Sequence, residues 1–96
     1  MFVITVKFTT HEKDTEKFKT RILKQAKESL ELESGCHVFD VCHDPKDINV
    51  VFLYEIYTNK DAFDMHLNSK HYLSFNEEVT PWVSEKIVSQ LQKQII

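Results

Sequence analysis

The residues best suited to acid–base chemistry gather between positions 55 and 66. Glu55 and Tyr57 lie two positions apart in a run of β-branched, aliphatic and aromatic residues. Side chains alternate across a strand, so these two share one face, about 7 Å apart. His66 follows in a segment with helical spacing, and an imidazole titrates near neutral pH. The sequence therefore predicts a proton-transfer site in which His66 accepts a proton and Glu55 acts as an acid or base, or orients the histidine.

The two strand residues also have structural interpretations. A buried Glu55 could pair with Arg21 or Lys24 of the long helix predicted earlier in the chain. Tyr57 points into the same space as Glu55, and could simply be a core aromatic residue whose hydroxyl group is hydrogen-bonded. Both alternatives remain open at this point.

Further candidates surround this group. Leu53 shares the strand face of the acid, and Phe63 shares the helix side of the histidine. His71 either takes part in the site or helps to cap the helix that follows. His37 and Asp40 fall on opposite faces of another predicted strand, so only one of them can face a common pocket.

The sequence predicts neither a metal site nor a bound cofactor. His66 and His71 are five positions apart across a predicted helix break, and no carboxylate triad or Cys-x-x-Cys motif accompanies them. The single glycine, Gly35, cannot form the glycine-rich loop of a nucleotide site. Cys36 and Cys42 lie about 20 Å apart in one predicted strand, so they cannot form a disulfide with each other.

The elements that must position these residues are predicted by periodicity. Strict alternation predicts a strand at Phe2–Phe8, and a continuous apolar run predicts a buried strand at Val50–Tyr57. Cys36–His43 alternates as well, and the short turn between it and Val50–Tyr57 predicts an antiparallel hairpin. A last strand is expected from about Ile87, where β-branched residues resume.

Helices are expected before and after the hairpin in the chain. The main helix is capped by Asp14 or Thr15 and runs to about Leu32. Gly35 lies just past its end, where a left-handed C-cap is expected. Two short helices follow the third strand, and Pro81 ends the second of them.

The resulting order, β-α-β-β-α-β, predicts an α+β, ferredoxin-like domain with an antiparallel sheet. Its 96 residues, 1–96, form a single domain. Helices on one side leave the second sheet face uncovered, although apolar residues occur on both faces of the strands. We therefore expect a homodimer that buries this face.

The composition excludes several classes of partner. The formal net charge is −3 and no basic run is present, so neither nucleic acid nor an anionic membrane is expected to bind. No apolar run approaches the ~20 residues of a membrane span, and Met1 opens directly into a strand without a leader. A cytoplasmic location is expected.

One stretch of the chain resembles a known family. An apolar strand ends in Tyr-Glu-x-aromatic, an acid-rich turn and Ala-Phe follow, and the stretch closes with His-Leu-x-Ser-x-His-aromatic. This pattern, at Phe52–Tyr72, resembles the antibiotic biosynthesis monooxygenase family, whose small α/β-barrel dimers include bacterial quinol monooxygenases. Gly35-Cys36, Phe39-Asp40-Val41 and Asp44-Pro45 extend the resemblance.

The resemblance implies a dimeric α/β barrel that oxidises a quinol, or another electron-rich aromatic, with dioxygen and without a cofactor. For this reaction we expect His66 to be the base, Tyr57 to donate a hydrogen bond to the phenolate and Glu55 to orient or tune the histidine. The expected substrate-binding residues are His71, Leu53, Phe63 and Asp40.

Two other functions remain open. Some similar proteins isomerise phosphorylated autoinducer-2, a sugar-like signal, and His11-Glu12 with the Phe39-Asp40-Val41 strand also resembles that branch. The same histidine and acid would serve either reaction. Alternatively, the domain is a non-enzymatic module that binds small ligands or responds to stress, and its polar residues only hold the fold.

Overall fold

The computed structural model describes all residues from 1 to 96 and has an α+β fold, as predicted. The strands are β1 (Phe2–Thr10), β2 (Cys36–His43), β3 (Val50–Tyr57) and β4 (Val83–Gln92), and the helices are α1 (Thr15–Leu32), α2 (Lys60–Asn68) and α3 (Lys70–Val79). Short 3-10 helices at Glu12–Asp14 and Thr80–Trp82 precede α1 and β4. No helix combines the length and the apolar composition needed to cross a membrane.

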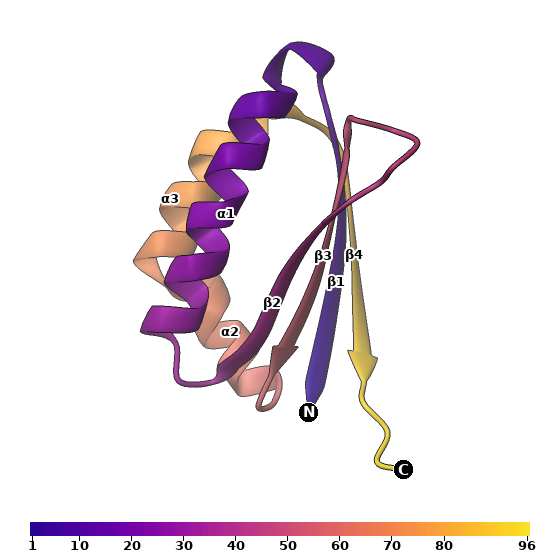
Figure 1. The fold of residues 1–96 in the computed structure, drawn as a ribbon. Coiled ribbons are helices and arrows are strands. Elements are labelled where there is room, and N and C mark those ends of the chain that lie inside the picture. Colours follow the sequence, from indigo (N-terminus) through magenta and orange to yellow (C-terminus); the bar gives the residue numbers. More distant parts are fainter.

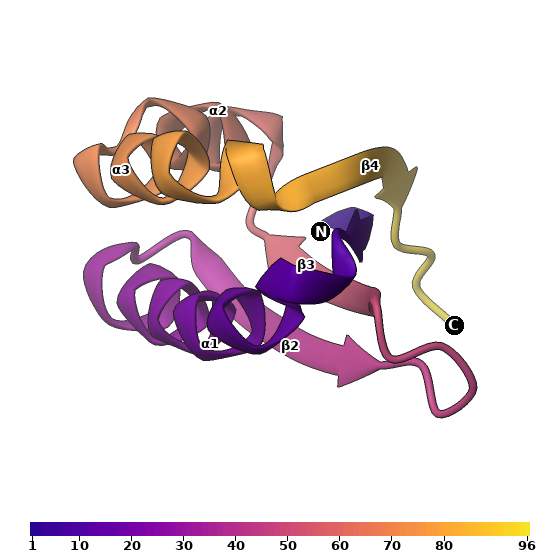
Figure 2. The same cartoon turned by 90° about the horizontal axis from the view of Figure 1, so that it is seen from above.

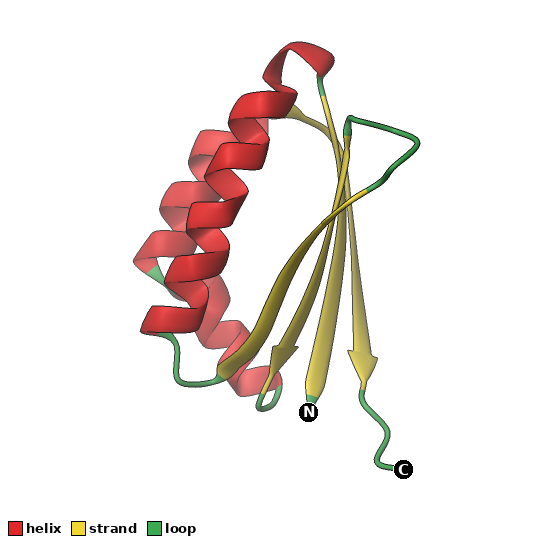
Figure 3. Ribbon diagram, viewed as in Figure 1, coloured by secondary structure: helices red, strands yellow, loops and turns green.

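The four strands form one antiparallel sheet in the order β2-β3-β1-β4. This is the predicted ferredoxin-like topology, and β2 and β3 form the predicted hairpin. All three helices cover the same face of the sheet (Figures 1 and 3). Viewed from above, α1 lies beside the pair α2 and α3 (Figure 2). Side chains between the helices and the sheet therefore make up the core and the site.

Strand β2 contains a bulge that the alternation pattern does not reveal. Cys36 pairs with Tyr57 and Val38 pairs with Ile56, so His37 is an extra residue in β2. The extra residue shifts the alternation by one position, so residues before and after the bulge that are predicted on opposite faces lie on the same face. Cys36 is consequently buried together with Phe39 on the helix-covered face, although strict alternation predicts opposite faces for them.

Gly35 serves a different purpose from the one predicted. No residue of the chain has a positive φ, so Gly35 is not a left-handed C-cap. A Cβ atom at this position would lie 2.7 Å from the Cβ atom of Ala62 in α2. The missing side chain therefore lets the start of α2 pack against the segment that joins α1 to β2.

The core fills the space between the helices and the sheet. Phe18 and Ile22 of α1 are fully buried, and the Phe18 ring lies 4.9 Å from the ring of Phe8 in β1. The ring of Phe75 in α3 also packs against the Phe18 ring, with 6.4 Å between the ring centroids. Such tilted aromatic pairs add about 0.5–1.5 kcal/mol each beyond the burial of their apolar area.

The opposite face of the sheet has no helix over it, as predicted. Phe52 of β3 is 38% exposed, and Ile87 and Leu91 of β4 are 49% and 53% exposed. These three side chains lie on the strand face that points away from the helices, as the pairing register shows. The uncovered face is thus partly apolar.

Candidate active site

A cavity of about 190 Å³ lies between the sheet and the helices α2 and α3. Ten of its 15 lining residues are hydrophobic. Four of the predicted site residues line this cavity, namely Leu53, Glu55, Phe63 and His66. The strand periodicity and the helical spacing therefore bring these four residues together as expected.

His66 is held in place by its helix and by a carboxylate. Helix α2 begins at an N-cap, Asn59, whose side chain accepts a hydrogen bond from the backbone N–H of Ala62. The imidazole of His66 is 3% exposed, and its Nδ1 atom lies 2.8 Å from Oε2 of Glu33. This is the only hydrogen bond of the imidazole ring, so Nε2 is available to a molecule in the cavity.

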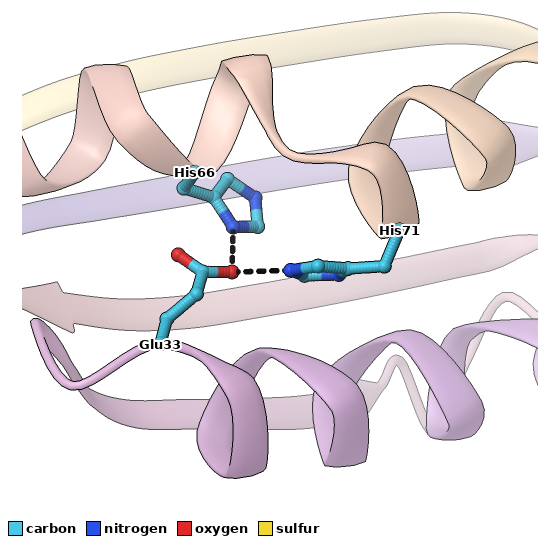
Figure 4. Close-up of side chains that lie close together, drawn as sticks. All are labelled: Glu33, His66 and His71. Carbon is cyan, nitrogen blue, oxygen red and sulfur yellow. Dashed lines mark hydrogen bonds and ion pairs between the residues drawn. The ribbon is translucent and has the colours of Figure 1, made fainter.

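Glu33 belongs to the site, although its sequence position does not predict this. It is the C-cap of α1, and its Oε2 atom also lies 2.7 Å from Nε2 of His71 (Figure 4). The predicted β2–β3 hairpin could have indicated its general position. Pairing of the two strands brings the residues before Cys36 next to the residues after Tyr57. The periodicity of the chain does not indicate which acid in this region turns towards the histidine.

Glu55 and Tyr57 interact with each other. The Tyr57 hydroxyl donates a hydrogen bond of 2.6 Å to Oε1 of Glu55, and both side chains are buried. Burial raises the pKa of Glu55 from 4.5 to about 6, and the hydrogen bond from Tyr57 and the proximity of His66 partly offset that rise. Burial and the Glu55 carboxylate also raise the pKa of Tyr57, so its hydroxyl stays protonated.

The structural alternatives for these two residues can now be distinguished. Arg21 pairs with Glu78 at 2.7 Å, and neither Arg21 nor Lys24 hydrogen-bonds to Glu55. Tyr57 is fully buried and does not line the cavity, which matches the interpretation as a core aromatic with a hydrogen-bonded hydroxyl group. Glu55 has no hydrogen bond to His66, so the carboxylate that orients the imidazole is Glu33.

The remaining candidates lie outside the apolar cavity. His71 does not cap α3, because Ser69 is its N-cap and accepts a hydrogen bond from the backbone N–H of Tyr72. Instead, Nδ1 of His71 lies 3.2 Å from Nε2 of Gln25. Asp40 is exposed and pairs with Tyr54 on the sheet face that points away from the helices.

His37 is exposed as well, and its Nε2 atom lies 2.6 Å from the Thr58 hydroxyl. Neither His37 nor Asp40 therefore lines the cavity. His37 is the unpaired residue of the bulge, and the strand register places Asp40 on the opposite face of the sheet. Both cysteines are free; Cys36 is buried and Cys42 is exposed. Burial, reinforced by the nearby carboxylates, raises the pKa of Cys36 to about 12, so this thiol stays protonated.

One group of side chains has the composition of a metal site. Glu33, His66 and His71 each offer one ligand atom, and these atoms lie within 4.8 Å of one another. The sequence predicts no metal site, because His66 and His71 lie five positions apart across a predicted helix break and no carboxylate triad accompanies them. The fold supplies a carboxylate from the C-cap of α1, 33 positions before His66.

The fold and the cavity define the class of protein. A ferredoxin-like domain with an apolar cavity and a buried acid–base group is suited to binding and converting a small molecule. The chain belongs to the antibiotic biosynthesis monooxygenase family, because the sequence model of that family matches residues 1–78. No protein with a curated description matches the chain significantly.

Solved structures agree with this assignment. A proposed antibiotic biosynthesis monooxygenase from Nitrosomonas europaea is 25% identical and superposes with a TM-score of 0.93, over 99% of this chain and 100% of that chain. A proposed monooxygenase from Lactobacillus acidophilus is 27% identical, with a TM-score of 0.89, over 95% of this chain and 44% of its own. A protein from Mycobacterium tuberculosis is 19% identical, with a TM-score of 0.90 over 99% of this chain and 96% of its own, and shares the fold.

Proposed function

We propose that this protein is a cofactor-independent monooxygenase that oxidises a quinol, or a similar electron-rich aromatic, with dioxygen. The observation that carries the proposal is the position of His66. Its ring lines an apolar cavity, while a carboxylate holds its Nδ1 atom from the other side. Family membership supports the oxygenase class, and the cavity supports an aromatic substrate.

The first step is removal of a proton from the substrate. A phenol has a reference pKa of about 10, so it needs a base before it can reduce dioxygen at neutral pH. Nε2 of His66 accepts this proton, and the imidazolium that forms is stabilised by the Glu33 carboxylate, which accepts the Nδ1–H hydrogen bond. Glu33 is thus a positioning residue that acts through His66.

The oxidation itself needs no external reductant. The deprotonated ring transfers electrons to dioxygen, one oxygen atom forms a C–O bond to a ring carbon, and the other leaves as water. A quinol gives a hydroxyquinone, and the ring supplies all the electrons that reduce dioxygen. A substrate ring that binds there would displace water from the apolar lining of the cavity.

Glu55 is the second polar group for substrate binding. It lines the cavity, and with a pKa of about 6 it is mostly ionised at neutral pH. Its carboxylate can accept the hydrogen of a second hydroxyl group, as the diol of a quinol requires. Tyr57 acts through Glu55, because its hydroxyl donates a hydrogen bond to Glu55 and not to the phenolate.

The size and lining of the cavity favour this class of substrate over the alternatives. Its volume of about 190 Å³ lies below the roughly 300–1,000 Å³ of pockets for drug-sized ligands, which suits a single ring. Lys86 is the only lysine or arginine among the lining residues, so a phosphorylated sugar would find little compensation for its charge.

We further propose that the functional unit is a homodimer. The uncovered face of the sheet carries Phe52, Ile87 and Leu91, which are large and exposed in the single chain. A second copy packed on this face would remove them from water.

Oxygen consumption by the purified protein with a hydroquinone tests the proposal. The expected result is consumption of dioxygen with formation of a hydroxyquinone, and one labelled oxygen atom in the product when ¹⁸O₂ is supplied. Chelators should not lower the rate, since none of the proposed steps uses a metal. Isomerisation of a phosphorylated sugar-like ketone without oxygen uptake would establish the second candidate instead.

A further inference from the structure

We propose that Glu33, His66 and His71 form a binding site for a divalent transition-metal ion of the Zn²⁺ type, and that the bound ion prevents His66 from accepting a proton. Glu33 is the C-cap of α1, and the two histidines belong to α2 and α3, so the ion would join the ends of all three helices. The consequence for His66 rests on the proposed function, whereas the binding of the ion does not.

The geometry of the three side chains is close to that of a coordination site. Glu33 Oε2 lies 2.8 Å from Nδ1 of His66 and 2.7 Å from Nε2 of His71 (Figure 4). In a tetrahedral site with bonds of about 2.0–2.1 Å, ligand atoms lie about 3.3 Å apart. Glu33 Oε2 would therefore have to move away from each nitrogen by about half an ångström, and all three ligand atoms already lie within 4.8 Å of one another. Glu33 is a cap residue after the last turn of α1, where its side chain can make such an adjustment.

The hydrogen bonds around this group leave buried polar atoms without partners. Oε1 of Glu33, Nε2 of His71 and Oε1 of Gln25 are buried and have no hydrogen-bond partner. Nε2 of His71 is close to Glu33, but its N–H direction does not align with the carboxylate oxygen. Unpartnered buried polar atoms are uncommon, and three of them in Glu33, His71 and the neighbouring Gln25 call for a physical explanation.

A metal ion would satisfy these atoms. It would accept electron pairs from Nε2 of His71 and from the Glu33 carboxylate. If the Gln25 amide turned by half a rotation, its Oε1 atom would accept the Nδ1–H of His71, which lies 3.2 Å from the amide in the present arrangement. A metal-bound histidine normally donates its second ring N–H to such an acceptor. Gln25 is thus positioned to support the ligand.

The donor set indicates which ions bind. Two imidazoles and one carboxylate suit Zn²⁺, Co²⁺, Ni²⁺ or Cu²⁺, whereas Mg²⁺ and Ca²⁺ prefer sites made only of oxygen ligands. An ion can reach the group without crossing the substrate cavity. Glu33 and His71 line a second, more polar cavity, and Asp61, which also lines it, adds negative charge.

The bound ion would change the chemistry of His66. An imidazole that binds a metal through Nδ1 must carry its proton on Nε2. Nε2 is the atom that faces the substrate cavity and accepts the proton in the proposed reaction. A metal ion at Glu33 would thus convert the base into a hydrogen-bond donor and inhibit the enzyme.

The binding is tested by calorimetric titration of tag-free protein with Zn²⁺, after removal of metals with a chelator. The expected result is one Zn²⁺ per chain and no comparable binding of Mg²⁺. Loss of a residue that only hydrogen-bonds to a metal ligand typically weakens metal binding about 10–100-fold. Glu33→Gln and His71→Ala should each weaken Zn²⁺ binding by more than this. His43→Ala is the matched control, because it removes an exposed histidine outside the group.

The effect on His66 is tested by NMR, independently of any activity. In long-range ¹H–¹⁵N spectra, saturating Zn²⁺ should fix the His66 proton on Nε2. Equal Zn²⁺ affinity of the wild type, Glu33→Gln and His71→Ala would show that only scattered surface histidines bind the ion and would overturn the site. Unchanged His66 signals in the Zn²⁺-bound protein would overturn its part as a ligand. Neither result would touch the proposed oxygenase reaction.

Discussion

The Nδ1 atom of His66 in α2 and the Oε2 atom of Glu33 at the end of α1 lie 2.8 Å apart. The interaction joins the end of α1 to α2 where the α1–β2 and β3–α2 connections are adjacent. Gly35 and Thr58 hold these connections together through a backbone hydrogen bond of 2.9 Å. The acid–base pair is therefore fixed by the backbone on both sides.

Replacing Glu33 by Gln tests its role as a positioning residue. The amide oxygen can still accept the Nδ1–H hydrogen bond, but the charge that stabilises the imidazolium is lost. We expect kcat to fall by about 10–100-fold with little change in KM, as is common for residues that orient a functional group. Glu33→Asp keeps the charge and should restore part of the rate. An unchanged kcat in Glu33→Gln would remove Glu33 from the mechanism.

Replacing Tyr57 by Phe tests the link between Tyr57 and Glu55. We expect kcat/KM of the wild type to rise with pH through about 6, because substrate binding needs the ionised Glu55. The hydrogen bond from Tyr57 lowers the pKa of Glu55, so its loss should move this part of the pH profile to higher pH. The fall in rate at neutral pH should be smaller than for His66→Ala. A profile that does not move would show that Glu55 is not the group that titrates.

Part of this site follows from the sequence. The two-residue period of side chains along β3 predicts that Leu53, Glu55 and Tyr57 share one face, and the pairing with β1 agrees with it. The helical spacing after Asn59 predicts that His66 faces the sheet. Local patterns of this kind depend only on residues near one another in the chain.

The rest depends on contacts between distant segments. The extra residue of the bulge, His37, is itself neither glycine nor proline, so the residue type does not mark it, and the bulge changes the faces of β2. The partner of His66 is 33 positions away, among several acids at the end of α1, so spacing cannot select it. The hydrogen bond between Tyr57 and Glu55 likewise depends on rotamers that the packing determines.

Gly35→Ala tests the close approach of α2 to the α1–β2 connection. A glycine with negative φ usually tolerates alanine, with a gain of about 0.4–1 kcal/mol from the unfolded state. Here the new Cβ atom meets Ala62 at 2.7 Å, so we expect a loss of about 1–3 kcal/mol in denaturant unfolding. Ala62→Gly in the same chain removes the contact and should recover part of that loss. A more stable Gly35→Ala protein would contradict the packing argument.

Sedimentation tests the homodimer. We expect twice the monomer mass at micromolar concentration, because the uncovered sheet face carries large apolar side chains. Leu91→Lys places a charge on this face and should shift the equilibrium towards the monomer. Leu23→Lys is a matched control, since Leu23 is also an exposed leucine, on α1. A wild-type protein that sediments as a stable monomer would contradict the dimer.

The most direct test of the account is the rate of oxygen uptake with a hydroquinone by His66→Ala, measured beside wild type and His43→Ala. The loss of a general base typically costs about 10²–10⁴-fold, so His66→Ala should fall by that factor, while His43→Ala, which changes an exposed histidine, should keep the wild-type rate. Circular dichroism should confirm that both variants are folded. Full oxygen uptake by a folded His66→Ala protein would contradict the assignment of His66 as the base.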